Sequence, residues 1–334
     1  MSSLPVTILT GFLGSGKTTL LNRLLARPEL SDSAVLINEF GEVALDHLLV
    51  RKIDDATVVL NSGCLCCTVR GDLVVAMRDL WQRRVKGEVP EFKRLIIETT
   101  GLADPAPILH TLMSDPFIGA YYRLDGVVVT IDAVNGVRQL DAQPEATKQA
   151  AVADRLLITK RDLASQEQLA ALEARLRELN PGAPLLASAH GEIDPALILD
   201  AGLFNAKNKH PDVKKWLNAE AFRIGHDHQH DPNRHNAHIA AFSFVTEEPV
   251  DWPSLAMALE ILTQSRGEQI LRLKGIVNVK GEEKPVVIHG VQHIFHPPVM
   301  LDAWPDEDRR TKLVFITNDL PRGMVEQILA VALS

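Results

Sequence analysis

Runs of consecutive apolar and β-branched residues alternate with helical patterns over roughly the first 200 positions of the chain. These runs predict seven strands, at residues 6–10, 34–38, 57–61, 94–98, 126–131, 155–159 and 184–187. Strands buried in a parallel sheet are hydrophobic on both faces, and the unbroken apolar stretches at 95–97 and 127–129 fit that description. The alternation therefore predicts an α/β fold, with one parallel sheet and helices on both of its faces.

Three stretches repeat apolar residues at the helical period and are predicted helices, at residues 17–26, 71–84 and 165–179. In the last of them, Leu169, Leu172, Leu176 and Leu179 fall on one stripe. The sequence Asn-Pro-Gly at 180–182 ends this helix, because proline and glycine do not continue the helical backbone.

The pattern changes after Gly202. Residues 222–238 hold five histidines among Asp, Asn, Gln and Pro, a composition typical of a linker or long loop. Beyond it the pattern predicts a strand, a helix, a hairpin around Gly281, a further strand and a final helix, at 239–245, 252–265, 270–293, 312–317 and 324–333. We therefore predict a large N-terminal domain at 1–203, a histidine-rich linker at 204–238 and a small α+β domain at 239–334.

Composition narrows the class of protein. The chain is 46% hydrophobic and 23% charged, as expected for a globular protein with buried cores. Its net charge of −8 argues against a dedicated nucleic-acid binder. No apolar run reaches the roughly 20 residues that span a bilayer, and the N-terminus lacks the basic region of a signal peptide. We expect a cytoplasmic protein that binds neither nucleic acid nor membrane.

A glycine-rich segment, GFLGSGKT at residues 11–18, lies between the first predicted strand and the first predicted helix. It matches the phosphate-binding pattern G-x-x-x-x-G-K-S/T in full, in which glycines let backbone N–H groups approach a phosphate closely. The dipole of the helix that starts here adds to the attraction for an anionic phosphate. We expect Lys17 to reach the β- and γ-phosphates and Thr18 to bind Mg²⁺. The residues assigned to the phosphates are Gly11, Gly14, Ser15, Gly16, Lys17, Thr18 and Thr19.

The predicted strand at 94–98 ends in a carboxylate, Glu98, and a Thr-Thr-Gly turn follows it. Ligands of parallel sheets bind at the C-terminal ends of the strands, so Glu98 is expected to act on the Mg²⁺ shell or to position the attacking water. Gly101 would let the backbone approach the γ-phosphate. The plainer alternative is that Glu98 is only the first exposed residue after a buried strand. The predicted catalytic residues are Lys17, Thr18 and Glu98.

Residues 159–162, Thr-Lys-Arg-Asp, follow an apolar strand and are similar to the N/T-K-x-D pattern of guanine-binding proteins. The carboxylate of Asp162 could accept two hydrogen bonds from guanine, from a donor pair that adenine lacks, and the stem of Lys160 could lie along the base. Thr159 replaces the usual Asn, which weakens one set of hydrogen bonds that brace the loop. A solvated pair of Lys160 and Asp162 is the alternative. The residues assigned to the base are Thr159, Lys160, Asp162, Ser188 and His190, the last two lying after the next strand.

All three cysteines of the chain lie within four positions, at Cys64, Cys66 and Cys67. Such clustering does not suit a disulfide framework and indicates a metal site. Thiolates favour Zn²⁺ or Cu⁺, and three of them leave a tetrahedral site one ligand short, which Glu39 or Glu42 could supply. Buried small hydrophobes or a redox pair are the alternatives. For the histidine-rich stretch, weak metal capture and a solvated linker both stay open.

Taken together, the segments GFLGSGKTT, NEFGE, GCLCC, ETTGLADP and TKRD resemble the CobW/YjiA family of metallochaperone GTPases, and the likeness runs nearly from end to end. The resemblance implies GTP hydrolysis coupled to delivery of Zn²⁺, or sometimes Co²⁺, with the three cysteines as ligands of the cargo. Ile37 stands where close relatives can carry a Glu implicated in metal binding. Either Glu42 substitutes for that Glu, or the site relies more on thiolates.

The resulting hypothesis is a nucleotide-gated metal carrier. GTP with Mg²⁺ orders the segment that holds the cysteines, a client metalloprotein docks with help from the C-terminal domain, and hydrolysis releases the ion. A homodimer is a further expectation. The rival hypotheses are a metal-responsive sensor or buffer whose nucleotide turnover is incidental, and a P-loop ATPase or kinase.

Overall fold

The computed structural model describes residues 3–38, 59–62, 69–188, 192–199 and 239–333. The chain divides into two compact units, one of residues 1–173 and 185–202 and one of residues 174–184 and 203–334. The predicted linker at 204–238 lies outside the described residues, and the predicted domain boundaries stay predictions.

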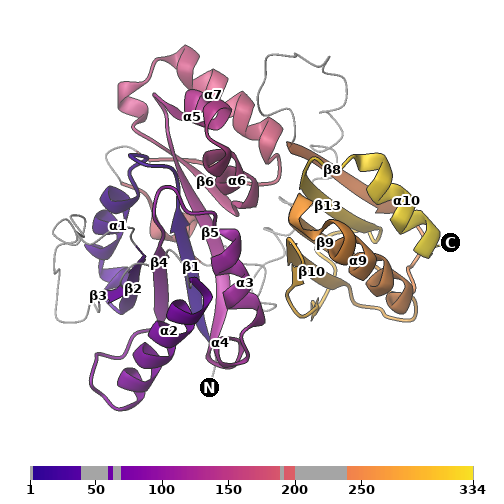
Figure 1. Cartoon of the computed structure of the whole chain (residues 1–334), viewed down its shortest axis with the longest axis horizontal. Coiled ribbons are helices and arrows are strands. Elements are labelled where there is room, and N and C mark those ends of the chain that lie inside the picture. The colour runs from indigo at the N-terminus through magenta and orange to yellow at the C-terminus, as the bar shows by residue number, and fades with distance from the viewer. Residues whose placement is uncertain (1–2, 39–58, 63–68, 189–191, 200–238, 334) are drawn as a thin grey trace. The chain divides into compact units, whose positions relative to one another are not determined.

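The first unit is built on a seven-stranded sheet with the order β3-β2-β4-β1-β5-β6-β7, in which every pair of neighbours is parallel (Figure 1). Its strands are β1 Leu4–Thr10, β2 Ser33–Asn38, β3 Val59–Ser62, β4 Arg94–Glu98, β5 Tyr122–Asp132, β6 Arg155–Thr159 and β7 Leu185–Ala187. All seven predicted strands are therefore present. Since β1 lies between β4 and β5, the loops that follow these strands meet at one edge of the sheet, where such folds bind ligands.

Helices cover both faces of this sheet. Leu95, Ile96 and Ile97 follow one another on β4 and point to alternate faces, yet none is more than 2% exposed. The helices are α1 Lys17–Leu25, α2 Val69–Val85, α3 Ala106–Ser114, α4 Pro116–Tyr121, α5 Gly136–Ala142, α6 Pro144–Val152 and α7 Gln166–Leu179. The predicted α/β class is confirmed, and α3 to α6 are additions to the predicted helices.

The second unit holds an antiparallel sheet with the order β11-β10-β9-β13-β8, to which β12 adds at β10. Its strands are β8 Ile239–Thr246, β9 Ile270–Val277, β10 Val286–Val291, β11 Ile294–Phe295, β12 Val299–Met300 and β13 Thr311–Asn318. Two helices, α9 Trp252–Arg266 and α10 Arg322–Leu333, pack side by side and share one hydrophobic core with the strands (Figure 1). The predicted hairpin around Gly281 is the β9–β10 pair. The predicted α+β class of this part is confirmed.

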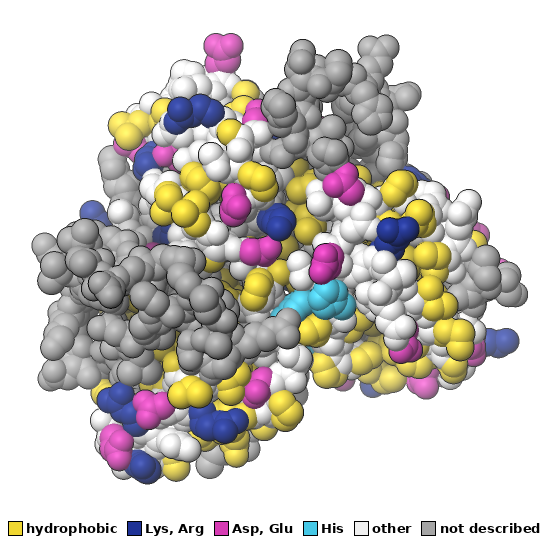
Figure 2. Space-filling view, viewed as in Figure 1, with side chains coloured by type: hydrophobic (Ala, Val, Ile, Leu, Met, Phe, Trp, Pro, Cys, Tyr) yellow, Lys and Arg dark blue, Asp and Glu magenta, His cyan; other side chains and the backbone are white. Residues whose placement is uncertain are grey.

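Charge and hydropathy of the described residues add two findings. No helix among them is long and apolar enough to span a lipid bilayer. In the view of Figure 2, the described Lys and Arg side chains are interspersed with Asp and Glu side chains.

Candidate functional site

The glycine-rich segment forms a tight loop between β1 and α1. Its three glycines, Gly11, Gly14 and Gly16, have φ of 141°, 73° and 92°. A Cβ on Gly11 would lie 2.4 Å from the carbonyl oxygen of Thr130 on β5, so only glycine fits there. The Ser15 hydroxyl, fully buried, hydrogen-bonds the Thr130 hydroxyl at 2.7 Å. The loop is thus fixed on the sheet and opens at the N-terminus of α1, an arrangement that binds anions.

The side chain of Lys17 lies inside this loop. Its Nζ donates to the carbonyl oxygens of Gly11 at 2.8 Å and Phe12 at 3.3 Å, and the residue is only 9% exposed. A cation held in a ring of backbone groups at a helix N-terminus gives the loop its affinity for phosphate. The contact of Lys17 with the β- and γ-phosphates stays a prediction.

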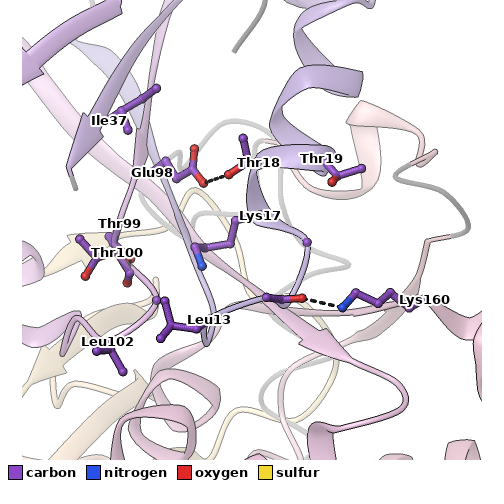
Figure 3. A pocket seen from close by; sticks show the side chains of 13 residues that line it. Leu13, Lys17, Thr18, Thr19, Ile37, Glu98, Thr99, Thr100, Leu102 and Lys160 are labelled. Carbon is purple, nitrogen blue, oxygen red and sulfur yellow. Dashed lines mark hydrogen bonds between the residues drawn. The ribbon is translucent and has the colours of Figure 1, made fainter. Parts of the chain in front are cut away.

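Two further oxygen groups face each other beside the loop. The Thr18 hydroxyl donates to Oε1 of Glu98 at 2.9 Å, and Figure 3 shows the two side chains pointing toward one another. Glu98 ends β4 and is 5% exposed, so the alternative of an exposed residue after a strand is wrong. The sheet order, with β4 beside β1, brings this carboxylate to the phosphate loop.

The turn after β4 packs directly on the phosphate loop. A Cβ on Gly101 would lie 2.6 Å from the backbone nitrogen of Leu13. The backbone N–H of Thr99 donates to the carbonyl oxygen of Leu9 at 3.0 Å, which ties the start of the turn to β1. Oγ1 of Thr100 is buried and has no hydrogen-bond partner among the described residues. That hydroxyl can serve a phosphate oxygen or a water.

These groups surround a cavity of about 410 Å³, a size that suits a small-molecule ligand. Figure 3 shows Leu13 and Leu102 close together at one side of it and Lys160 at another. The lining residues are Leu13, Gly14, Gly16, Lys17, Thr18, Thr19, Ile37, Glu98, Thr99, Thr100, Gly101, Leu102 and Lys160. Ile37 therefore contributes an apolar side chain to this cavity.

The loop after β6 lies against the phosphate loop. The hydroxyl of Thr159 lies 2.7 Å from the carbonyl oxygen of Ser15 and 3.1 Å from that of Ile131. Nζ of Lys160 donates to the carbonyl oxygen of Gly14 at 2.7 Å (Figure 3). Threonine in place of asparagine therefore keeps a brace between the two loops.

The remaining predicted contacts to the base are placed as follows. Asp162 lies exposed on the short 3-10 turn Arg161–Leu163. Ser188 is 1% exposed, and its Oγ has no hydrogen-bond partner among the described residues. His190 lies outside the described residues. The structure thus brings Thr159, Lys160 and the phosphate loop together.

Asp132, at the end of β5, is a site residue that we did not predict. Its Oδ2 accepts from Nζ of Lys160 at 2.7 Å, and its Oδ1 accepts from the backbone N–H groups of Val134 and Asn135. Although burial opposes ionisation, the hydrogen bonds from Lys160 and Asn135 hold the pKa of Asp132 below its ordinary value. Its place at the C-terminal end of a central strand was the signal in the sequence.

Replacing Asp132 with Asn should weaken binding of GDP and GTP by a similar factor, about three- to tenfold, because Lys160 loses its anionic partner. Lys160 is 37% exposed, so solvent screening keeps the effect modest. Since the pKa of Asp132 is lowered, the ion pair persists throughout this range, and the ratio of wild-type to variant affinity should be flat from pH 8 to about pH 5. Titration calorimetry with GDP measures both effects. Asp115→Asn, at the N-cap of α4, is the control and should leave affinity unchanged.

The predicted metal ligands Cys64, Cys66, Cys67, Glu39 and Glu42 lie outside the described residues, as does the histidine-rich stretch. Among the described residues, no three or more His, Cys, Asp or Glu side chains are grouped to hold a metal ion. The thiolate site therefore stays a prediction.

A parallel sheet with a glycine-rich loop, a lysine at the first helix and a carboxylate on the adjacent strand defines a P-loop nucleotide-binding protein. Two family models match the chain. The nucleotide-binding domain of CobW, HypB and UreG matches residues 5–187, and the C-terminal domain of the cobalamin synthesis protein CobW matches residues 239–333. The chain belongs to the CobW family of nucleotide-binding proteins.

Individual relatives cover nearly the whole chain. It is 34% identical over 330 residues to the zinc chaperone YjiA of Escherichia coli K12, a match that covers 99% of each chain. It is 29% identical over 352 residues to the zinc-regulated GTPase metalloprotein activator 1 of Schizosaccharomyces pombe, covering 96% of this chain and 84% of that protein. The crystal structure of Zn(II)-bound YjiA GTPase from E. coli aligns with a TM-score of 0.74 at 29% identity and covers 99% of each chain.

Proposed function

We propose that this chain is a GTP hydrolase that acts as a metallochaperone, coupling GTP binding and hydrolysis to the binding and transfer of Zn²⁺. The observation that carries the proposal is the meeting of Lys17, the Thr18–Glu98 pair and Lys160 at one cavity. The names of the full-length relatives, a zinc chaperone and a zinc-regulated GTPase metalloprotein activator, support both halves of it.

The hydrolytic part rests on charge placement. Lys17 binds the β- and γ-phosphate oxygens from within the loop, and the turn at Gly101 approaches the γ-phosphate from the side of β4. Glu98, held by the Thr18 hydroxyl, lies where a carboxylate can orient the attacking water. Catalysis of this reaction depends mainly on such positioning and on charge stabilisation.

The oxygen groups in the cavity also fit Mg²⁺, which prefers hard oxygen ligands. The Thr18 hydroxyl and the Glu98 carboxylate, 2.9 Å apart, are oxygen ligands of this kind. The hydroxyl of Thr100, which has no partner in the described part of the chain, belongs to the lining of the same cavity. We propose that Thr18 binds the ion directly and Glu98 acts on its shell. When bound, Mg²⁺ supplies neutralisation of the charge that develops on the phosphate oxygens.

We assign guanine to the base side of the site. Thr159 and Lys160 join the loop after β6 to the phosphate loop. Ser188 directly follows the neighbouring strand β7, and its buried hydroxyl has no partner within the described part of the chain. Asp162, two residues beyond Lys160, is the proposed acceptor for the guanine N–H groups. Competition of unlabelled GTP and ATP against a fluorescent GDP tests this assignment. Equal displacement by the two nucleotides would contradict it.

The metal part of the proposal rests on the three cysteines and makes a direct prediction. Cys66→Ala should weaken Zn²⁺ binding at least about 100-fold, because the loss of a mere supporting group at a metal site already costs up to that factor. GDP affinity should be unchanged, since the phosphate loop and Lys160 are intact. Competition with a chromogenic zinc chelator, in the presence of a non-hydrolysable GTP analogue, measures the zinc affinity.

The same assay separates a carrier from its rival. A carrier needs a higher Zn²⁺ affinity with the GTP analogue than with GDP, and transfer of Zn²⁺ to an apo-metalloprotein that depends on hydrolysis. Equal affinity in both nucleotide states would leave a metal-responsive sensor or buffer with incidental turnover. Unchanged zinc stoichiometry and affinity in Cys66→Ala would show that the ligands are assigned wrongly. Co²⁺ in place of Zn²⁺ identifies which metal the site prefers.

A further inference from the structure

The short helix α6 carries a fully buried amide side chain that faces the turn after β4. Gln149 is 0% exposed, and its Nε2 donates to the carbonyl oxygens of Gly101 at 3.3 Å and Ala103 at 2.9 Å. These carbonyls belong to the turn that packs on Leu13 of the phosphate loop. One side chain from α6 therefore holds the backbone of the Gly101 turn, which under the proposed function approaches the γ-phosphate.

The orientation of this amide follows from its surroundings. The two backbone groups to which it hydrogen-bonds are carbonyls, so its NH₂ end must face them. Oε1 is buried and has no hydrogen-bond partner among the described residues. Burying an amide oxygen without a partner destabilises the fold, a cost that a shorter or apolar residue would avoid. The contact to the turn is the feature of the structure that offsets this cost.

The neighbouring residue adds a second link between α6 and the same turn. Nζ of Lys148 donates to Oδ2 of Asp104 at 3.2 Å, while Oδ1 of Asp104 caps the N–H of Ala106 at the start of α3. This ion pair is about one-third exposed on each side, so it is the weaker link. Together the two side chains fix the turn from residue 101 to 104.

We propose that Gln149 is a positioning residue for GTP hydrolysis, which sets the turn at Gly101 and so makes the site discriminate the triphosphate from the diphosphate. Its two hydrogen bonds described above go to the turn and not to the phosphate loop, so we expect GDP binding to be independent of it. Its action is on the γ-phosphate side alone. The inference rests on the proposed GTPase function for its kinetic consequence, but not for its effect on nucleotide discrimination.

Gln149→Met keeps the length of the side chain and removes its donors. We expect kcat for GTP to fall about tenfold, since small misplacements of a positioning group have effects of this size or larger. The affinity for a non-hydrolysable GTP analogue should fall at least about threefold relative to that for GDP, with the affinity for GDP itself unchanged. Phosphate release under saturating GTP and calorimetry with both nucleotides measure these quantities in the full chain.

Thr147→Val is the matched control. Thr147 is 1% exposed on the same helix, but its hydroxyl donates to Leu140 of α5 and away from the turn. It should lower the thermal midpoint as much as Gln149→Met does while leaving the ratio of affinities and kcat unchanged. Equal losses in the two variants, or a parallel fall in GDP and GTP-analogue affinity for Gln149→Met, would overturn the inference. Lack of turnover in the wild-type chain would count against the proposed function alone, because the affinity ratio still decides the role of Gln149.

Discussion

Replacing Lys17 with Ala should lower kcat/KM for GTP by about 1,000-fold. The ammonium lies inside the phosphate loop, 2.8 Å from the carbonyl oxygen of Gly11, and no other Lys or Arg among the described residues lines the cavity except Lys160. Lys160 is committed to Gly14 and Asp132 on the base side. No described neighbour can therefore take over the charge stabilisation at the β- and γ-phosphates. Phosphate release at saturating and limiting GTP measures the loss.

Loss of affinity and loss of fold must be told apart in this variant. Nζ of Lys17 donates to carbonyl oxygens of the loop and not to a strand backbone in the bonds described above, so its removal should leave the sheet intact and change the thermal midpoint without nucleotide by only a few degrees. Lys17→Arg is the informative partner variant, because it keeps the charge but not the compact shape that fits the loop. Turnover by Lys17→Ala within about tenfold of wild type would show that the loop is not the catalytic phosphate site.

The strands of the N-terminal unit could be predicted because a parallel sheet is buried on both faces, which leaves long apolar runs. The start of β5 could not be predicted from the sequence, since Arg123 and Asp125 interrupt its run of apolar residues. Asp125 is nevertheless buried in the strand, where the Thr7 hydroxyl donates to it at 3.2 Å. A polar residue of this kind is accommodated by a partner 118 positions away, which no local pattern reveals.

Short helices were missed for a related reason. The helices α5 and α6 have seven and nine residues, too few for an apolar stripe to repeat clearly. Gln149 lies on one of them, 46 and 48 positions from the carbonyls it binds, so its role became visible only in the folded chain. The phosphate loop, by contrast, is local: its residues are consecutive and carry their own signal. The thiolate site has an equally local signal but lies outside the described residues, and it stays a prediction.

Gly101→Ala should lower kcat by about 100-fold while GDP affinity stays within about threefold of wild type. The new Cβ would lie 2.6 Å from the backbone nitrogen and 2.8 Å from Cα of Leu13, atoms of the phosphate loop that cannot swing aside as a flexible side chain can. The turn must therefore move away from the loop by an appreciable part of an ångström. The phosphate loop itself, to which we assign the diphosphate part of the nucleotide, keeps its anchor on Thr130. Single-turnover hydrolysis, which excludes product release, together with calorimetry on GDP measures the two quantities.

The control for this variant is another glycine to which a methyl group can be added without contact. Gly119 on α4 is exposed and has open space where its Cβ would lie, so Gly119→Ala should leave kcat unchanged and raise stability by up to about 1 kcal/mol. If Gly101→Ala hydrolysed GTP at the wild-type rate, the turn would not need close contact with the phosphate loop. The proposal that the Gly101 backbone approaches the γ-phosphate would then be wrong. A fall in GDP affinity as steep as the fall in kcat would show that the substitution had disturbed the phosphate loop rather than the turn. The proposed division of the site, with Gly101 on the γ-phosphate side and the loop on the diphosphate side, would then be wrong.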